Sequence, residues 1–371
     1  MLQNVTILQV VIRQRQLEKS MHTFYYPDHT QHDPARLHRP DDAHWNKYYA
    51  EVAQRGQIIH NALQTADLGP ISPPGDFGLS PIQDVHAHQM LTLLQNAHDQ
   101  MKLETGRDVA LPETFSLRPR SKRHFYSILG QLGLYCFDTS SPIFAQTWEA
   151  AYWSVQTAVS AAALIAAEPE KTVYALCRPP GHHAAADQFG GFCYLNNVAI
   201  AANWLVQQGQ RVAILDIDYH HGNGTQEIFY GRSDVLFLSI HADPRYEYPY
   251  YWGFADEYGD GPGLGFNHNY PLPPGTQAPA YLDTLARALI QIRAFVPDSL
   301  IVSLGVDTGE GDPTGTFQLT TPDFAQIGQA IGQLHLPTAV VQEGGYRLDT
   351  LGQHVTAFLT GLLQRQNVLP S

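Results

Sequence analysis

The sequence has few charged side chains and a marked shortage of basic ones. Charged residues make up only 15% of the 371 residues and hydrophobic residues 44%, which predicts a large buried core rather than disorder. The 22 Lys and Arg against 35 Asp and Glu give a formal net charge of −13. An acidic surface repels phosphate groups, so nucleic acid is not an expected partner and a cationic partner or substrate is favoured.

Cysteines are also scarce, and long apolar runs are missing. The three cysteines, Cys136, Cys177 and Cys193, show no CxxC spacing. An odd number of scattered cysteines fits reduced thiols better than a disulfide framework, so we expect a cytoplasmic protein. The most apolar N-terminal run, residues 5–12, has no preceding basic residues and is too short to span a bilayer, so we expect neither a signal peptide nor a membrane partner.

Several common catalytic motifs are absent. The chain contains no HExxH, no GxSxG nucleophile elbow and no GxxxxGK phosphate loop. The segment GPGLGF at 261–266 is not a dinucleotide site, because no strand-like run precedes it. No internal repeat of 20 to 50 residues appears, which disfavours solenoids and propellers.

From about residue 144, short apolar runs alternate with longer segments of helical period, which predicts an α/β fold with a central, mainly parallel sheet flanked by helices. Strands are predicted at 172–176, 211–216, 235–240, 299–304 and 338–342. Helices are predicted near 144–168, 196–208, 278–296, 321–334 and 349–365. In such sheets, functional residues are expected just after the strands.

The first third of the chain is less regular. A strand is predicted at 22–26 and helices near 44–65 and 85–104. The following stretch to residue 143 is rich in proline, glycine and basic residues, and it could be a lid, a self-association surface or a solvated loop; its basic residues are Arg107, Arg118, Arg120, Lys122 and Arg123. We expect an N-terminal extension of unknown role at 1–20, then a single domain at 21–371 with an insertion loop near 105–137.

The segment ILDIDYHHGNG at 214–224 carries the densest chemical signal. Asp216, Asp218 and His220 follow one another at every second position, and side chains two apart in extended backbone point the same way. Two carboxylates and an imidazole are expensive to bury together unless a cation neutralises them. The spacing therefore predicts a metal site, with ordinary turn residues at a sheet edge as the alternative.

A second polar cluster follows the run TVYALC. Two prolines and Gly181 form a rigid turn that holds His182 and His183 directly beyond the expected strand end. Paired histidines suit proton transfer, because imidazole titrates near neutral pH. Gly190, Gly191 and Phe192 then form a tight apolar turn in which Phe192 either lines a pocket or packs in the core.

Two further strand ends carry polar groups beside glycines. Asp307 follows the run LIVSLGV, and Tyr346 follows TAVVQ and a Gly-Gly pair. Asp218, His220 and Asp307 are thus candidate ligands, with an acid/base pair and an electrophile beside them. Three protein ligands with an open position are typical of a catalytic zinc site, so the implied reaction is hydrolysis.

The motifs RPPGHHA, GGFCYLNN, DIDYHHGNGTQEIFY, DTGEGDPTGTF and QEGGY resemble the histone deacetylase family, and most closely its bacterial acetylpolyamine amidohydrolase branch. The resemblance covers most of the chain from Met21. It implies an arginase/deacetylase fold, a zinc ion held by Asp218, His220 and Asp307, and removal of acetyl groups from N-acetylated amines.

The resemblance also implies the roles of the remaining site residues. His183 is expected to act as the general base and then the general acid, with Asn223 as its hydrogen-bond partner where another branch has a carboxylate. Asp216 is expected to orient a charged His182. Tyr346 stands where weakly active relatives have histidine and is expected to donate a hydrogen bond to the oxyanion.

Substrate and ion contacts are implied as well. Asp138 matches the acid at the channel rim, and Gly191 and Phe192 match one channel wall. Aromatic residues of 245–253 are a candidate second wall, and a packed surface loop is the other interpretation. A potassium ion is expected near Asp218 and His220, with Asp216, Ser239 and Ile240 as further ligands.

The favoured substrate is a small, cationic N-acetylated amine such as an acetylpolyamine, and the enzyme is expected to be a homodimer. Three alternatives stay open: an acetyl-lysine protein deacetylase, a catalytically silent acyl-amine binding protein, and a metal such as iron(II) in place of zinc.

Overall fold

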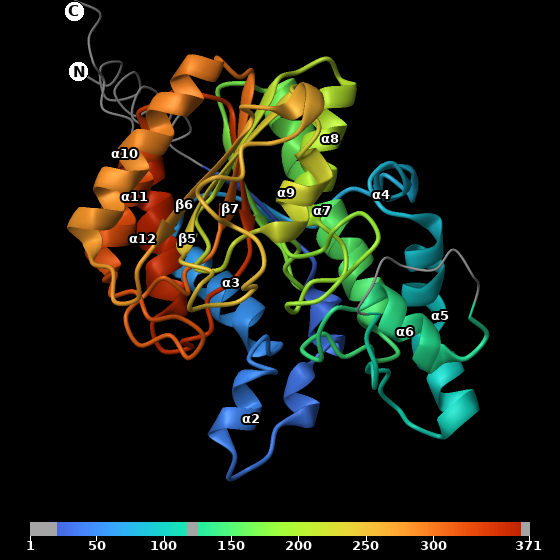
Figure 1. Cartoon of the computed structure of the whole chain (residues 1–371). Helices are drawn as coiled ribbons and strands as arrows, with labels where there is room; N and C mark the ends of the chain where they lie inside the picture. Colours follow the sequence, from blue (N-terminus) through green and yellow to red (C-terminus); the bar gives the residue numbers. More distant parts are fainter. Residues whose placement is uncertain (1–20, 117–124, 365–371) are drawn as a thin grey trace, which may run out of the picture.

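The computed structural model describes residues 21–116 and 125–364, and its strands there form one parallel sheet (Figure 1). The strand order is β2-β1-β3-β8-β7-β4-β5-β6. The strands are β1 (His22–Tyr25), β2 (Ile71–Ser72), β3 (Thr172–Leu176), β4 (Val212–Asp216), β5 (Val235–Ala242), β6 (Asn267–Leu272), β7 (Ser299–Leu304) and β8 (Thr338–Gln342). Every neighbouring pair is parallel, which confirms the predicted α/β class.

Helices cover both faces of this sheet (Figure 1). One face packs against α7 (Thr147–Ala167), α8 (Asn197–Gln207) and α9 (Asn223–Phe229), and the other against α3 (Gln54–Ala66), α10 (Ala278–Phe295), α11 (Thr321–Gly332) and α12 (Leu351–Leu363). In β3, Val173 and Ala175 face the first group, whereas Tyr174 and Leu176 face the second. The central strands are therefore buried on both faces, which explains their unbroken apolar sequences.

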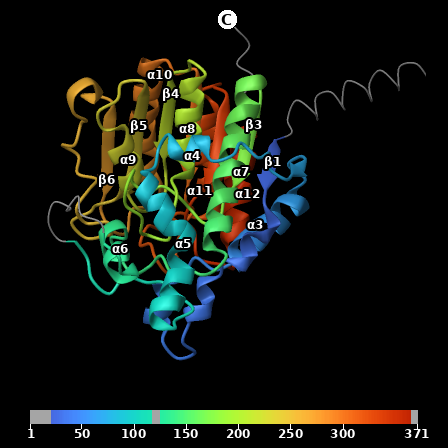
Figure 2. The same ribbon diagram turned by 90° about the vertical axis from the view of Figure 1, so that its right-hand side faces the viewer.

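A third apolar cluster lies beside the sheet (Figure 2). Helices α4 (Ser80–Gln83), α5 (His88–Thr105) and α6 (Ile128–Tyr135) pack there against α7 and the loops after β3, and Met90, Leu94 and Leu132 are fully or almost fully buried. Helix α6 lies inside the predicted insertion at 105–137. The basic residues Arg118, Arg120, Lys122 and Arg123, and the expected extension at 1–20, lie outside the described residues.

The predicted helix at 44–65 was wrong. Two helices occupy this stretch, α2 (Ala43–Lys47) and α3, and the chain between them is not helical. The backbone carbonyls of Glu51 and Val52 accept hydrogen bonds from the Arg178 side chain, at 2.9 and 3.1 Å. These tertiary contacts hold Glu51 fully buried and take the place of helical hydrogen bonds.

The remaining elements are short or lie at sheet edges. Strands β2 and β6 and helices α4, α6 and α9 were not predicted, whereas the six predicted strands match β1, β3, β4, β5, β7 and β8 to within two residues. Strand β6 was missed because its sequence, NHNYPL, is polar and contains proline, as an edge strand allows. Three 3-10 helices complete the secondary structure of the described residues: η1 (Pro27–Gln31), η2 (Pro34–Leu37) and η3 (Gly261–Gly263).

Among the described residues, only α7 is long and apolar enough to cross a membrane by length and composition. Two thirds of its most apolar window (67%) is buried inside the protein. The helix packs on β3 and against α8, with Val155, Ala158 and Ala162 fully buried. Its apolar sequence is that of a core helix.

Candidate active site

The candidate site lies at the carboxyl ends of four neighbouring strands, β3, β8, β7 and β4. The loop after β3 carries His182 and His183, and the loop after β4 carries Asp218 and His220. Asp307 follows β7 and Tyr346 follows β8. Because these strands are parallel neighbours, their loops meet at one edge of the sheet, as the sequence predicted.

The structure brings together the three predicted metal ligands. One ligand atom each from Asp218, His220 and Asp307 lies within 4.8 Å of the others, and no other such group occurs at residues 21–116 and 125–364. The His220 Nδ1 atom lies 3.3 Å from Asp218 Oδ1 and 3.1 Å from Asp307 Oδ2. Both carboxylates are buried, so the two acids and the imidazole lie close together out of contact with water.

The electrostatics of this group fit a cation. Burial, together with the negative charge of Asp218, raises the pKa of Asp307 to about 7. Burial disfavours a charged His220, but the two carboxylates outweigh it and raise its pKa to about 10. The cluster therefore draws in a positive charge, and two oxygens with one nitrogen are suitable ligands for a divalent metal.

Backbone close to these carboxylates leaves no room for a side chain. A Cβ atom on Gly344 would lie 2.4 Å from Asp307 Oδ2 and 2.5 Å from Asp218 Oδ2. The Gly344 amide instead donates a hydrogen bond of 2.8 Å to Asp218 Oδ2. The glycine pair after β8 is thus required by the close approach of the backbone to the metal cluster.

The two histidines after β3 have opposite electrostatic environments. The Nδ1 atom of His182 lies 3.0 Å from Asp216 Oδ2, and the charges of Asp216 and Asp218 overcome burial and raise its pKa to about 10. The Nδ1 atom of His183 lies 2.8 Å from Asn223 Oδ1. Burial lowers the pKa of His183 well below its usual value, and the positive charges of His182 and His220 lower it further. His182 is therefore charged beside a neutral His183.

A carboxylate that sequence reasoning did not single out supports this turn. Glu343, fully buried at the end of β8, accepts hydrogen bonds through Oε2 from the backbone amides of Gly181, at 2.7 Å, and His182, at 3.2 Å. It thereby joins the loop after β8 to the loop after β3. The motif QEGGY contains this residue, but nothing in the sequence alone indicates which loop it binds.

Tyr346 is held from three sides. Its amide donates a hydrogen bond of 2.7 Å to Asp312 Oδ2, and its ring packs edge-on against Phe192 with 5.3 Å between centroids. The guanidinium carbon of Arg55 lies 4.5 Å from the centre of the ring. Burial raises the pKa of Tyr346 well above its usual value, so the phenol keeps its proton and can donate a hydrogen bond.

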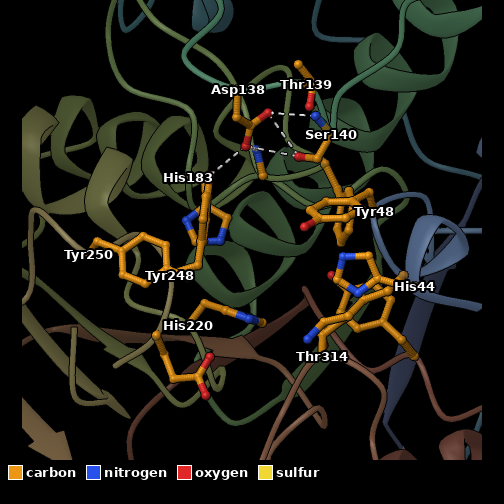
Figure 3. A pocket seen from close by; sticks show the side chains of 15 residues that line it. His44, Tyr48, Asp138, Thr139, Ser140, His183, His220, Tyr248, Tyr250 and Thr314 are labelled. Atoms are coloured by element: carbon orange, nitrogen blue, oxygen red, sulfur yellow. Dashed lines mark hydrogen bonds between the residues drawn. The ribbon is translucent and has the colours of Figure 1, made fainter. Parts of the chain in front are cut away.

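His183, His220 and Tyr346 line a cavity of about 350 Å³ (Figure 3). Gly191 and Phe192 contribute one wall, as expected, and Tyr248, from the aromatic stretch 245–253, also lines the cavity. Asp138 Oδ2 accepts hydrogen bonds from the Gly191 amide, at 2.8 Å, and from the Tyr248 hydroxyl, at 2.9 Å. Asp138 therefore ties the two walls together.

Seven lining residues were not predicted. Figure 3 shows His44 and Tyr48 across the cavity from His183 and His220. The full set is His44, Lys47, Tyr48, Thr139, Ser140, Glu247 and Thr314. They come from α2 and its end, from the segment after Asp138, from the stretch after β5 and from the loop after β7. Thr314 lies within the motif DTGEGDPTGTF, but nothing in the sequence indicated that its side chain faces the cavity.

The predicted potassium residues lie behind the metal cluster. Asp216 and Ser239 are register partners on the adjacent strands β4 and β5, and Ile240 follows Ser239. The Ser239 hydroxyl is 2.8 Å from His241 Nδ1. With Asp218 and His220 just beyond the end of β4, this set gathers around two neighbouring strands.

Comparison with known proteins agrees with this geometry. The histone deacetylase domain family matches residues 49–362. Acetylpolyamine amidohydrolase 2 of Pseudomonas aeruginosa is 47% identical over 313 residues, which cover 84% of this chain and 90% of that protein. The acetylpolyamine amidohydrolase of Burkholderia pseudomallei is 42% identical over 349 residues, covering 92% of this chain and 98% of that protein.

Solved structures are similar as well. The crystal structure of acetylpolyamine aminohydrolase from Burkholderia pseudomallei matches with a TM-score of 0.85 at 42% identity, over 92% of this chain and 98% of that one. The HDA15 HD domain matches with a TM-score of 0.76 at 26% identity, over 95% and 90% of the two chains. These matches confirm the predicted arginase/deacetylase fold.

Proposed function

Because the chain belongs to the histone deacetylase family, and is therefore a deacetylase, we propose that it removes acetyl groups from acetylpolyamines with zinc as its metal ion. The observation that carries the proposal is the convergence of a three-ligand cluster, a histidine pair and a tyrosine at one edge of the sheet, where His220, His183 and Tyr346 line one cavity. The 42–47% identity to acetylpolyamine amidohydrolases over most of the chain supports the substrate class.

Asp218, His220 and Asp307 would hold the zinc ion. When bound, zinc supplies a Lewis acid that polarises the amide carbonyl and makes a water molecule more acidic. The family is generally metal-dependent, and the two facing carboxylates give this chain a reason to bind a cation.

His183 is the general base of the proposed reaction. An amide oxygen only accepts hydrogen bonds, so Asn223 Oδ1 fixes the proton of a neutral His183 on Nδ1. The lone pair of Nε2 is then free to take a proton from the attacking water and later to deliver it to the departing amine. The charged His182, paired with Asp216, helps to keep His183 neutral until the proton arrives.

Tyr346 is the proposed oxyanion donor. Its protonated phenol lines the same cavity as His183 and His220, and its backbone is held by Asp312. A preformed donor needs little rearrangement when negative charge develops on the carbonyl oxygen, so it favours the transition state over the ground state.

Charge and shape favour a small cationic substrate. Asp138 and Glu247 line the cavity, and the net charge of the chain is −13. Phe192 and Tyr248 both line the cavity, and their aromatic rings suit an aliphatic chain with an acetyl group at one end. An acetyl-lysine protein deacetylase is the second candidate, since it would use the same reaction.

The substrate assignment is tested by comparing the turnover of an acetylated diamine with that of an acetyl-lysine peptide. We expect a higher kcat/KM for the acetylated diamine. Equal or faster peptide turnover would reject the polyamine assignment. Elemental analysis of protein purified without added metal tests zinc against iron(II), because oxygen-rich ligand sets do not select one cation strongly.

Further features of the proposal come from the family resemblance. A potassium ion would be held by Asp216, Asp218, His220, Ser239 and Ile240, and omission of potassium from the assay tests it. A homodimer is proposed and is tested by light scattering of the purified protein. A cytoplasmic location is proposed because Cys136, Cys177 and Cys193 are free, buried thiols.

A further inference from the structure

A second cavity of about 400 Å³ lies beside the catalytic one. It is largely aromatic, and its aromatic side chains are Phe137, Tyr248, Tyr250, Tyr251 and Trp252. The last three are exposed, at 51%, 83% and 41%, and all belong to one stretch of chain. Large exposed aromatic groups gathered around a hollow are typical of a binding site rather than of a solvated loop.

The described residues around this cavity carry charge of one sign. Asp138 and Glu227 line it, and no lysine or arginine of residues 21–116 and 125–364 does. Aromatic faces attract organic cations, and carboxylates beside them add to this attraction. The lining therefore suits an alkylammonium group. The catalytic cavity differs, because Lys47 and His44 stand among its lining residues.

The two cavities are separated by shared side chains. Asp138, Tyr248 and Tyr250 line both. Tyr248 is fixed as a partition by its hydrogen bond to Asp138 and by the edge-on contact of its ring with His183, at 5.0 Å between centroids. Figure 3 shows Tyr248 and Tyr250 side by side on the same flank of the catalytic cavity as His183.

The backbone places Tyr250 in a strained position at this boundary. Its φ of 65° lies in the left-handed region, which a bulky residue rarely adopts. The ring follows that of Tyr248 at 6.5 Å and precedes that of Tyr251 at 6.5 Å, both at steep angles. The three rings thus form a continuous aromatic path from the catalytic cavity to the second one.

We propose that the second cavity binds the distal ammonium group of a long acetylated polyamine whose acetyl end lies at the metal cluster. The inference rests on the proposed function. A polyamine that extends out of the catalytic cavity passes Asp138 and Tyr250, which line both cavities. Lys47 in the lining of the catalytic cavity repels the distal ammonium group, whereas the aromatic and acidic lining of the second cavity attracts it. The cavity therefore favours an acetylated triamine over a shorter diamine.

The test compares two substrates on the full, metal-loaded protein. In the double variant Tyr251→Ala/Trp252→Ala, KM for an acetylated triamine should rise about tenfold, as expected for the loss of two exposed cation–π contacts, with kcat unchanged. Glu227→Gln should raise the same KM about threefold. KM for an acetylated diamine should stay the same in both variants.

Tyr246→Ala is the matched control, because Tyr246 is a similarly exposed aromatic residue of the same stretch that lines neither cavity. It should change neither KM. Equal changes of KM for both substrates, or none in the double variant, would overturn the proposal.

A binding measurement separates this inference from the proposed function. Calorimetric titration with an unacetylated triamine should show binding to the wild-type protein and at least fivefold weaker binding to the double variant. If the wild-type protein hydrolyses no acetylated amine, the proposed function is wrong, but this titration still shows whether the second cavity binds an organic cation. Equal affinity of wild type and double variant would exclude the cation site.

Discussion

The Nδ1 atom of His183 donates a hydrogen bond of 2.8 Å to the side-chain oxygen of Asn223, the first residue of helix α9. Asn223 is neutral, so it orients the imidazole without stabilising its charged form as a carboxylate would. The neighbouring His182 has a carboxylate partner, Asp216, at 3.0 Å. Two adjacent histidines are thus given different protonation states by one amide and one acid.

Asn223→Asp should therefore move the pH dependence of catalysis. A carboxylate beside His183 favours the imidazolium, so the pKa of His183 rises. As the pH is lowered, His183 is then protonated, and lost as a base, at a higher pH than in the wild type. We expect the acidic limb of the kcat/KM profile to move upward, with lower activity at neutral pH. Asn96→Asp, which adds the same charge on the exposed face of α5, is the control and should leave the profile in place. An unmoved limb in Asn223→Asp would contradict the assignment of His183.

Tyr346→Phe should lower kcat about 10²- to 10³-fold, the usual effect of removing one oxyanion donor. KM should change little, because the ring and its contacts with Phe192 and Arg55 stay. Steady-state kinetics on a folded, metal-loaded variant measure this, with the exposed Tyr258→Phe as control. A variant that keeps most of its activity would remove Tyr346 from the mechanism.

Asp307→Asn should reduce the bound metal and the activity together. The amide removes one anionic ligand, so the cluster attracts a cation less strongly. Elemental analysis of the purified protein should give well under one metal per chain, whereas Asp99→Asn, a change at a highly exposed acid, should keep the wild-type content. A chelator should abolish wild-type activity, and added zinc should restore it. Full metal content in Asp307→Asn would contradict the ligand set.

His86 predicts a pH dependence of stability. Its Nδ1 lies 2.9 Å from the carbonyl of Ala185, and its Nε2 accepts the amide of Asn196 at 2.9 Å, so the ring must be neutral. Burial lowers its pKa to about 4 from 6.5. As the pH falls from 6.5 towards 4, the unfolded chain takes up a proton at His86 and the folded protein does not. The free energy of unfolding is therefore highest above pH 6.5 and falls by up to about 3 kcal/mol over this range.

Urea unfolding at pH 7.5 and pH 5 measures this effect. The wild type should lose more free energy of unfolding between these values than His86→Gln, which has no imidazole to protonate there. His88→Gln is the control, since His88 is exposed on the first turn of α5, and it should keep the wild-type difference. The same difference in all three proteins would show that His86 does not contribute.

The central strands and the polar site residues at their carboxyl ends could both be predicted from the sequence. Strands buried on both faces are mostly apolar, as in β4 (VAILD) and β7 (SLIVSL). Asp216 is the last residue of β4, and Asp307 lies in the turn that follows β7. Parallel pairing then forces such turns to one edge. The position of Tyr346 after a strand and a glycine pair indicated an electrophile, whereas family resemblance supplied its role as oxyanion donor and the role of Asn223.

The parts that were missed depend on contacts between distant segments. The break between α2 and α3 follows from the pairing of Glu51 with Arg55 and Arg178, which no local pattern reveals. Glu343 is placed by amides more than 160 residues earlier in the chain. The second cavity arises where the stretch around Trp252 meets the start of α9 and the segment at Phe137, so its existence depends on the folded arrangement.

The strand order has a consequence for synthesis of the protein. β3 lies beside β8, with Thr172 paired to Thr338, and it has no direct pairing with β4, the next central strand to be made. A nascent chain that has released β4 and the loop after it thus holds both histidines and two ligands beside strands β3 and β4, while β8 and β7, which lie between these two strands, have not yet been made. Closing so long a loop is entropically demanding, and the site can assemble only after β7 and β8 have left the ribosome.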